Sequence, residues 1–172
     1  MVSKSAKFVI YPLVPIGDGK HSISDETLIF IWKRIEEEGK VETLFYDASV
    51  KDIQGWLNFI KQPGVFPVII WDETHKKIVH ISWLKDAFDV SAWVHHCAIG
   101  PYKRGVWEAV LEYWRSFDNL KMLLGLTPKT NDKAVKILKK ICKFTVVGEI
   151  PMVCNMVYQG ERVPGILSYY QL

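Results

Sequence analysis

The chain has few cysteines and no long apolar run. Cys97, Cys142 and Cys154 are its three cysteines, an odd number without paired spacing. A disulfide framework is therefore not expected, and a reducing cytoplasm is the predicted location. Apolar stretches such as Val65–Trp71 are too short to span a bilayer, and residues 1–7 lack the apolar centre of a signal peptide. We expect no membrane partner.

The chain also lacks a strong charge of one sign. Its 22 basic and 19 acidic residues give a net charge of +3. Only Lys133–Lys143 is a dense basic run, and on a helix such a run is typical of a solvated face. Nucleic-acid binding proteins usually carry a clustered basic face, so we do not expect a nucleic-acid partner.

Large apolar side chains, by contrast, are abundant. Apolar residues make up 49% of the 172 residues, charged residues 24%, and seven residues are Trp. Disordered chains have few aromatic residues, and this length suffices to bury a core. No internal repeat or linker is visible. We therefore expect one globular domain over residues 1–172.

Apolar periodicity and turn residues predict seven strands and four helices. Ser24 is a predicted N-cap, and the acidic residues 36–38 are expected to face solvent before Gly39 ends the first helix. The fold class is α/β (α+β), with a central mixed β-sheet of about seven strands flanked by four helices. The predicted strands are Lys7–Val14, Val65–Trp71, Lys77–Leu84, Phe88–Ile99, Leu120–Thr127, Phe144–Tyr158 and Val163–Tyr170. The predicted helices follow Ser24 and cover Ile53–Ile60, Gly105–Ser116 and Asn131–Ile141.

A strand, helix and strand near the C-terminus carry the most informative motif. Asn131 and Ala134 fit the pattern Asn-x-x-Ala, and Cys142 with Phe144 stands for a following Gly-Phe with one residue inserted. This segment resembles the acyl-CoA end of the GNAT N-acetyltransferase superfamily. The predicted order of elements is that of the superfamily too, and the resemblance spans the whole chain.

The resemblance also implies a pyrophosphate-binding loop after the fourth predicted strand. The superfamily pattern is Gln/Arg-x-x-Gly-x-Gly/Ala, and Gly105 aligns with its first glycine. Tyr102 then stands where Gln or Arg is usual, and Trp107 where a small residue is usual. Lys103 and Arg104 could supply the charge that the motif lacks. The residues expected to bind acetyl-CoA, as a co-substrate, are Ala98, Ile99, Tyr102, Lys103, Arg104, Gly105, Val106, Trp107 and Asn131. For Asn131 a plain helix cap is an equal alternative.

The catalytic candidates are His95, His96 and Glu149. Consecutive strand residues point to opposite faces, so only one of the two histidines can face a cleft. An imidazole has a pKa near neutrality and could deprotonate an ammonium substrate, although a hydrogen-bonded structural histidine is the alternative. Leu138 stands where the superfamily often has a tyrosine that protonates the departing thiolate. No metal site is expected, because adjacent side chains diverge and no second ligand pair follows.

These features predict transfer of an acetyl group from acetyl-CoA to a primary amine of unknown identity. The alternative is a catalytically inactive GNAT-fold binding module or phage-associated structural module, because Tyr102, Trp107 and Leu138 depart from the superfamily pattern. The Trp-rich strands and the short loop resemble compact phage and prophage members of the superfamily. The C-terminal hairpin could pair across a homodimer, and the sequence leaves the oligomeric state open.

Overall fold

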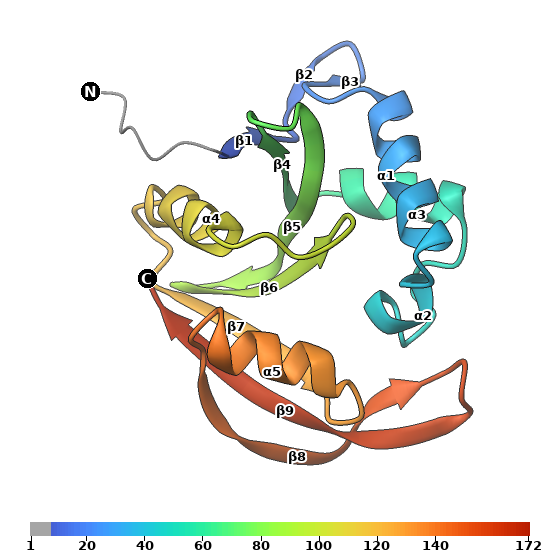
Figure 1. Cartoon of the computed structure of the whole chain (residues 1–172), viewed down its shortest axis with the longest axis vertical. Coiled ribbons are helices and arrows are strands. Elements are labelled where there is room, and N and C mark those ends of the chain that lie inside the picture. Colours follow the sequence, from blue (N-terminus) through green and yellow to red (C-terminus); the bar gives the residue numbers. More distant parts are fainter. Residues whose placement is uncertain (1–7) are drawn as a thin grey trace.

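A mixed sheet of seven strands runs through the computed structural model, which describes residues 8–172 (Figure 1). The strand order is β1-β4-β5-β6-β7-β9-β8, and every neighbouring pair is antiparallel except β6 and β7. The strands are β1 (Phe8–Pro12), β4 (Phe66–Asp72), β5 (Lys77–Phe88), β6 (Ser91–Ala98), β7 (Met122–Pro128), β8 (Thr145–Met156) and β9 (Glu161–Gln171). A separate small hairpin consists of β2 (Pro15–Gly17) and β3 (Lys20–His21). Lys7, the first residue of the first predicted strand, lies outside the described residues.

Five helices flank the sheet within residues 8–172, where four were predicted. They are α1 (Asp25–Glu37), α2 (Val41–Leu44), α3 (Ile53–Lys61), α4 (Val106–Arg115) and α5 (Asp132–Lys140). The additional helix is α2, a single turn too short to show a periodic pattern. Ser24 caps α1 as predicted, because its hydroxyl oxygen accepts a hydrogen bond from the Thr27 amide. The fold class is confirmed.

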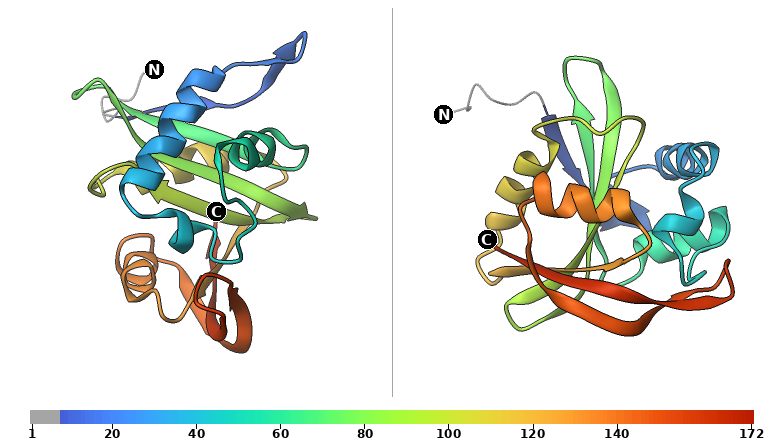
Figure 2. Two further views of the ribbon diagram at one scale, coloured as in Figure 1. Left: turned by 90° about the vertical axis from the view of Figure 1, so that its right-hand side faces the viewer. Right: turned by 60° about the horizontal axis from the view of Figure 1, so that its bottom comes forward.

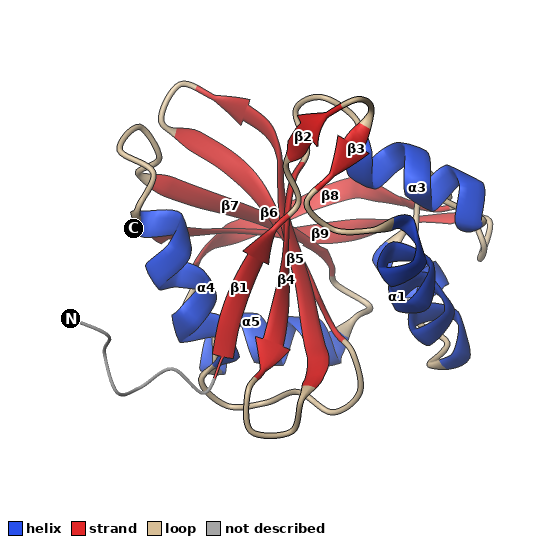
Figure 3. Cartoon of the chain, turned by 90° about the horizontal axis from the view of Figure 1, so that it is seen from above, coloured by secondary structure: helices blue, strands red, loops and turns tan. Residues whose placement is uncertain are grey.

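Each face of the sheet buries its own apolar core. Figure 3 shows α1 and α3 on one side of the strands and α4 and α5 on the other. Alternate residues of β4 belong to different cores. Val68 and Ile70 pack toward α4, whereas Ile69 packs toward α1 and α3. The core beneath α1 and α3 is rich in aromatic rings. Those rings are Trp32, Phe45, Trp56, Phe59 and Trp83.

The one parallel pair in the sheet is short. Only Ser91–Trp93 of β6 pair with Met122–Leu124 of β7. By contrast, β5 pairs with β6 as far as Ala98, and β9 pairs with β7 as far as Pro128. Figure 2 shows the consequence, with the orange and red unit of α5, β8 and β9 standing apart from the green strands. The strands β6 and β7 therefore separate toward their C-terminal ends.

None of the helices within residues 8–172 combines the length and the apolar character that crossing a bilayer requires.

The β8–β9 hairpin is fixed to β7 at a glycine. Gly165 lies opposite Pro128 of β7 and Ile150 of β8. A Cβ atom at Gly165 would lie 2.6 Å from Cγ1 of Val153, 2.7 Å from Cδ1 of Leu126 and 2.9 Å from Sγ of Cys154. These distances are shorter than van der Waals contact, so the position requires a residue without a side chain.

We predict that Gly165→Ala destabilises the protein by about 1–3 kcal/mol, because the added methyl group overpacks the site. Urea denaturation followed by circular dichroism measures this change. The control is Gly148→Ala in the same hairpin, where a Cβ atom would meet nothing within 4 Å. Equal denaturation midpoints for the two variants would contradict the prediction.

Candidate functional site

A cavity of about 450 Å³ opens where β6 and β7 separate. One wall is the C-terminal half of β6, and the opposite wall is the C-terminal half of β7 together with α5. The connection between α1 and α2 closes the third side. The lining residues taken up below are Glu38, Lys40, Tyr46, His80, His95, His96, Ala98, Tyr102, Asn131 and Leu138.

The edge of β6 presents peptide groups to this cavity. The Ile99 amide donates to the Val79 carbonyl at 2.9 Å, so it faces β5 and not the gap. Because peptide groups alternate between the two neighbours of an antiparallel strand, those of His96 and Ala98 face β7. There the pairing with β7 has already ended. Of the two residues predicted to hold the cofactor on β6, the geometry favours Ala98 and turns the Ile99 amide away.

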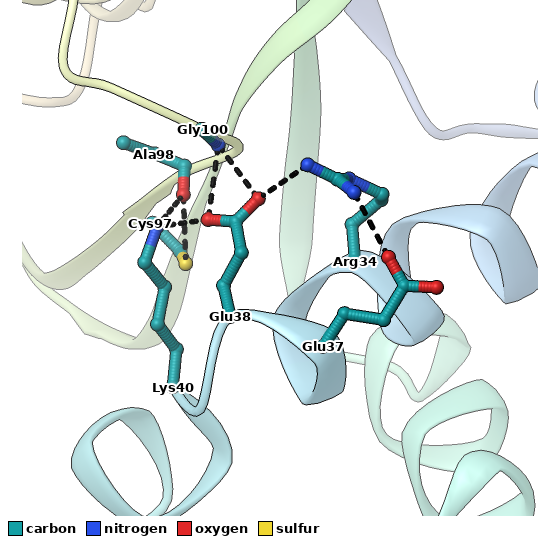
Figure 4. Close-up of polar contacts among 7 residues, drawn as sticks. All are labelled: Arg34, Glu37, Glu38, Lys40, Cys97, Ala98 and Gly100. Carbon is teal, nitrogen blue, oxygen red and sulfur yellow. Dashed lines mark hydrogen bonds and ion pairs between the residues drawn. The ribbon is translucent and has the colours of Figure 1, made fainter.

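Glu38 lies against the end of β6, although the sequence analysis placed it in solvent. Its side chain is 17% exposed, and both carboxylate oxygens accept hydrogen bonds from the Gly100 amide, at 2.9 and 3.0 Å. Arg34 and Lys40 donate to the same carboxylate, as Figure 4 shows. The expectation was wrong because Glu38 follows the last residue of α1, and Gly39, with φ of 64°, then turns the chain.

Burial alone would raise the pKa of Glu38. The hydrogen bonds from Lys40 and Gly100 and the charges of Lys40 and Arg34 outweigh it, and the pKa lies below its usual value. Glu38 is therefore a carboxylate at neutral pH. It places a negative charge on the cavity wall.

His95 and His96 point to opposite faces of β6, as predicted, but both line the cavity, so the expectation that only one of them can face a cleft was wrong. His95 stacks on Trp83 with ring centroids 5.4 Å apart, and His96 lies 5.2 Å from Trp107. Burial lowers the pKa of each histidine to about 4. The expectation of a pKa near neutrality was wrong, because both half-buried rings lie against aromatic side chains, where burial disfavours the charged imidazolium. Both are neutral imidazoles at neutral pH.

A third histidine, His80 of β5, lies beside His96 with ring centroids 5.3 Å apart. Neither of its ring nitrogens has a hydrogen-bond partner within residues 8–172, and burial lowers its pKa. A buried polar atom without a partner is costly, and His80 also lines the cavity. Both ring nitrogens are enclosed by the fold, so His80 is a buried neutral imidazole beside the cavity.

The predicted pyrophosphate loop leads from β6 to α4. Gly105, with φ of 88°, is the N-cap of α4, and the left-handed conformation suits glycine. The Lys103 ammonium donates to Asp72 at 2.8 Å, so its charge is already engaged. Arg104 is exposed and forms no ion pair among residues 8–172. The free charge of the loop is therefore that of Arg104.

The two aromatic residues of the loop differ in position. Tyr102 lines the cavity, and burial raises the pKa of its hydroxyl. Trp107 is 2% exposed, and its indole nitrogen donates to the Cys142 carbonyl at 3.1 Å. The side chains of Val106 and Trp107 belong to the core under α4, so the indole leaves the cavity open.

The remaining candidates do not meet at one place. Asn131 caps α5 by accepting from the Ala134 amide at 3.1 Å, and it also lines the cavity. Leu138 lines the cavity without a polar group. Glu149 instead pairs with Lys129 at 2.8 Å on β8, away from the cavity lining. The structure brings the histidines together with Ala98, Tyr102 and Asn131, but not with Glu149.

Four of the polar cavity residues that sequence reasoning missed are Glu38, Lys40, Tyr46 and His80. Glu38 and Lys40 lie in an acidic and basic run that is typical of solvent-exposed helix ends. The nearest signal was Gly39 between them, which marks a sharp turn. Tyr46 lies in a segment without periodicity, and burial raises its pKa.

The chain is similar in structure to several acetyltransferases. A spermidine N-acetyltransferase from Vibrio cholerae, in complex with CoA and spermine, matches with a TM-score of 0.70 and 13% identity over 96% of this chain and 95% of that one. An acetyl transferase from Salmonella typhimurium, which modifies the N-terminal serine of ribosomal protein L7/L12, matches with a TM-score of 0.72 and 7% identity. The match covers 98% of this chain and 96% of that one. An aminoglycoside N(6')acetyltransferase from Legionella pneumophila matches with a TM-score of 0.68 and 15% identity, over 96% of this chain and 92% of that one. No protein-family model and no curated protein matches the chain. The likeness shows that the chain has the GNAT fold.

Asp72 anchors the loop through a fully buried carboxylate. Burial acts to raise the pKa of Asp72, but hydrogen bonds from Lys103 and His75 hold it well below its ordinary value of 3.8. A carboxyl group with a lowered pKa stabilises the folded state fully above its unfolded pKa. That stabilisation is lost as the pH falls through the folded pKa.

We therefore predict that Asp72→Asn lowers the melting temperature at neutral pH. The difference from wild type should stay constant down to about pH 4 and then shrink in stronger acid. Thermal unfolding across this pH range measures both effects. The control is Asp118→Asn, an exposed aspartate without an ion pair among residues 8–172. A difference that widens in acid would contradict the prediction.

Proposed function

We propose that the protein is an N-acetyltransferase that transfers an acetyl group from acetyl-CoA to a primary amine. The observation that carries this proposal is the separation of β6 and β7 beyond Trp93 and Leu124, with the cavity between them. A thioester with an amide-bearing arm needs such a gap. The gap offers peptide groups of β6 that do not pair with β7, beside an apolar wall.

The peptide groups of the gap suit the pantetheine arm. Its amides can extend the sheet along β6 by bonding the peptide groups of His96 and Ala98, as an added strand does. Asn131 uses its side-chain oxygen to cap α5, which leaves its amide NH₂ group to donate to the arm.

The pyrophosphate group is assigned to the start of α4. The amides around Gly105 and the positive end of the helix dipole favour an anion there, and Arg104 adds a free charge. Lys103 contributes by holding the loop to Asp72 and not by direct contact. Val106 and Trp107 contribute backbone amides only, because their side chains are buried in the core.

Catalysis in this site rests on positioning. The amine attacks the thioester carbonyl, and a peptide N–H on β6 stabilises the negative charge that develops on the carbonyl oxygen. His95 and His96, with pKa values of about 4, are weak bases at neutral pH, so the acceptor ammonium loses its proton to water. Leu138 cannot protonate the departing thiolate. Tyr46 lines the cavity and keeps its proton at neutral pH, which makes its hydroxyl the candidate donor, whereas the Tyr102 hydroxyl is enclosed by the fold.

The acceptor class is a primary ammonium. Glu38 places a carboxylate on the side of the cavity that α1 and α2 form, which suits a positively charged group. Spermine in one similar structure is such a cation. A cytoplasmic location and a phage or prophage origin stay predictions from the sequence.

A binding module without turnover is the second candidate. Leu138 in place of a hydroxyl residue and the engagement of Lys103 by Asp72 favour it. The two candidates share the fold and differ in chemistry, so turnover separates them. Release of free thiol from acetyl-CoA, with polyamines, aminoglycosides and peptide N-termini as acceptors, supports the enzyme.

We predict that Arg104→Glu weakens acetyl-CoA binding at least ~10-fold, because it replaces the free charge of the loop with a repulsive one. Isothermal titration calorimetry measures the affinity. Arg162→Glu is the control, since it makes the same charge change on the exposed β8–β9 hairpin. Wild-type protein that binds no acetyl-CoA at millimolar concentration would refute the proposed function. Binding without thiol release from any amine would favour the module.

A further inference from the structure

The cavity already contains an amine that belongs to the chain. The side chain of Lys40 extends from the connection between α1 and α2 and is 29% exposed. Its ammonium donates to the Ala98 carbonyl at 2.6 Å and to the Glu38 carboxylate at 2.5 Å (Figure 4). The ammonium thus lies on the edge of β6, within the gap between the two separated strands.

These contacts are those that a substrate ammonium would make. A primary ammonium has three donors and no acceptor, and Lys40 directs two of them at a carboxylate and a peptide carbonyl. Both partners line the cavity. Under the proposed function, the Ala98 peptide group also binds the pantetheine arm. Lys40 therefore lies where the thioester and the acceptor must meet.

Other lysines of the chain lack this placement. Lys33 lies on α1 and is exposed, and Lys129 pairs with Glu149 away from the cavity lining. Lys133 lines the cavity but is exposed at the start of α5. Lys40 alone among these four has its ammonium bonded to the β6 edge.

We propose that Lys40 is a self-acetylation site, which acetyl-CoA bound in the same cavity modifies. The inference rests on the proposed function and extends it to a residue of the chain itself. The Lys40 ammonium loses one proton to water, and the amine nitrogen attacks the acetyl carbonyl carbon. A C–N amide bond forms and the C–S bond breaks. CoA leaves as a thiolate and takes up a proton, and the nitrogen loses its second proton to water. The net products are acetyl-lysine, CoA thiol and one released proton.

Acetylation would change the electrostatics of the cavity. It removes the positive charge of Lys40 and therefore the ion pair with Glu38. Glu38 would keep its hydrogen bonds from Gly100 and Arg34, and without the Lys40 charge it could pair with the ammonium of a second amine. Self-acetylation thus prepares the acceptor site by clearing its internal ammonium.

The experiment incubates the folded chain with acetyl-CoA alone, without an added amine. Intact mass spectrometry measures acetyl groups per chain, and peptide mapping assigns them. We expect Lys40 to be acetylated at least ~10-fold faster than Lys33, because its amine is held beside the thioester. Labelling should be faster at mildly alkaline than at neutral pH, since only the neutral amine has a free electron pair. Lys40→Arg should abolish the fast labelling, and Glu38→Gln should slow it. The matched control Lys33→Arg should leave it unchanged.

Two further measurements separate the possible failures. Chain unfolded in urea gives the purely chemical rate, and equal Lys40 labelling of folded and unfolded chain overturns the inference. If calorimetry shows binding and amines are acetylated but Lys40 is not, this inference fails and the proposed function stands. If acetyl-CoA does not bind, the proposed function fails, and the inference fails with it.

Discussion

The pairing of β6 with β7 stops after three residues, while their outer partners, β5 and β9, follow each strand to its end. β6 and β7 are therefore fully paired on their outer sides and lose pairing only toward each other. A buried peptide group without a partner is costly, so the junction has to be satisfied by something other than a strand. Here Lys40 bonds the Ala98 carbonyl and Glu38 bonds the Gly100 amide. The cavity and the contacts that Lys40 and Glu38 make in it therefore both follow from the early end of the β6–β7 pairing.

Two carboxylates fix the loop that follows β6 from both ends. Glu38 holds it at Gly100, and Asp72 holds it through Lys103. Both carboxylates are shielded from water, and hydrogen bonds keep their pKa values low, so both contacts persist at neutral pH. Arg104, directly after the second anchor, remains exposed. The loop is thus held in place before any anion binds, which reduces the entropy that binding would cost.

The charged residues of the cavity are Glu38 and Lys40 beside α1 and α2 and Lys133 on α5, whereas its β6 wall is polar and neutral. His95 and His96 are buried against aromatic rings, which makes them neutral, and the hydroxyls of Tyr46 and Tyr102 remain protonated. The negative charge lies at the α1–α2 side, on Glu38. Within the chain, Lys40 and Arg34 pair with that carboxylate.

The sequence by itself determined the order of the elements, the strands that build the sheet and the caps of α1 and α5, because periodicity and capping depend on neighbours in the chain. The alternation of His95 and His96 followed from the same local geometry. Tertiary structure alone decided that β6 and β7 separate, that Glu38 and Lys40 enter the gap, that Lys103 is bound by Asp72 and that Glu149 lies elsewhere. These contacts join residues up to 62 positions apart, and burial at such contacts sets the histidine pKa values. No local sequence pattern shows which distant residues will pack against a side chain and exclude water from it.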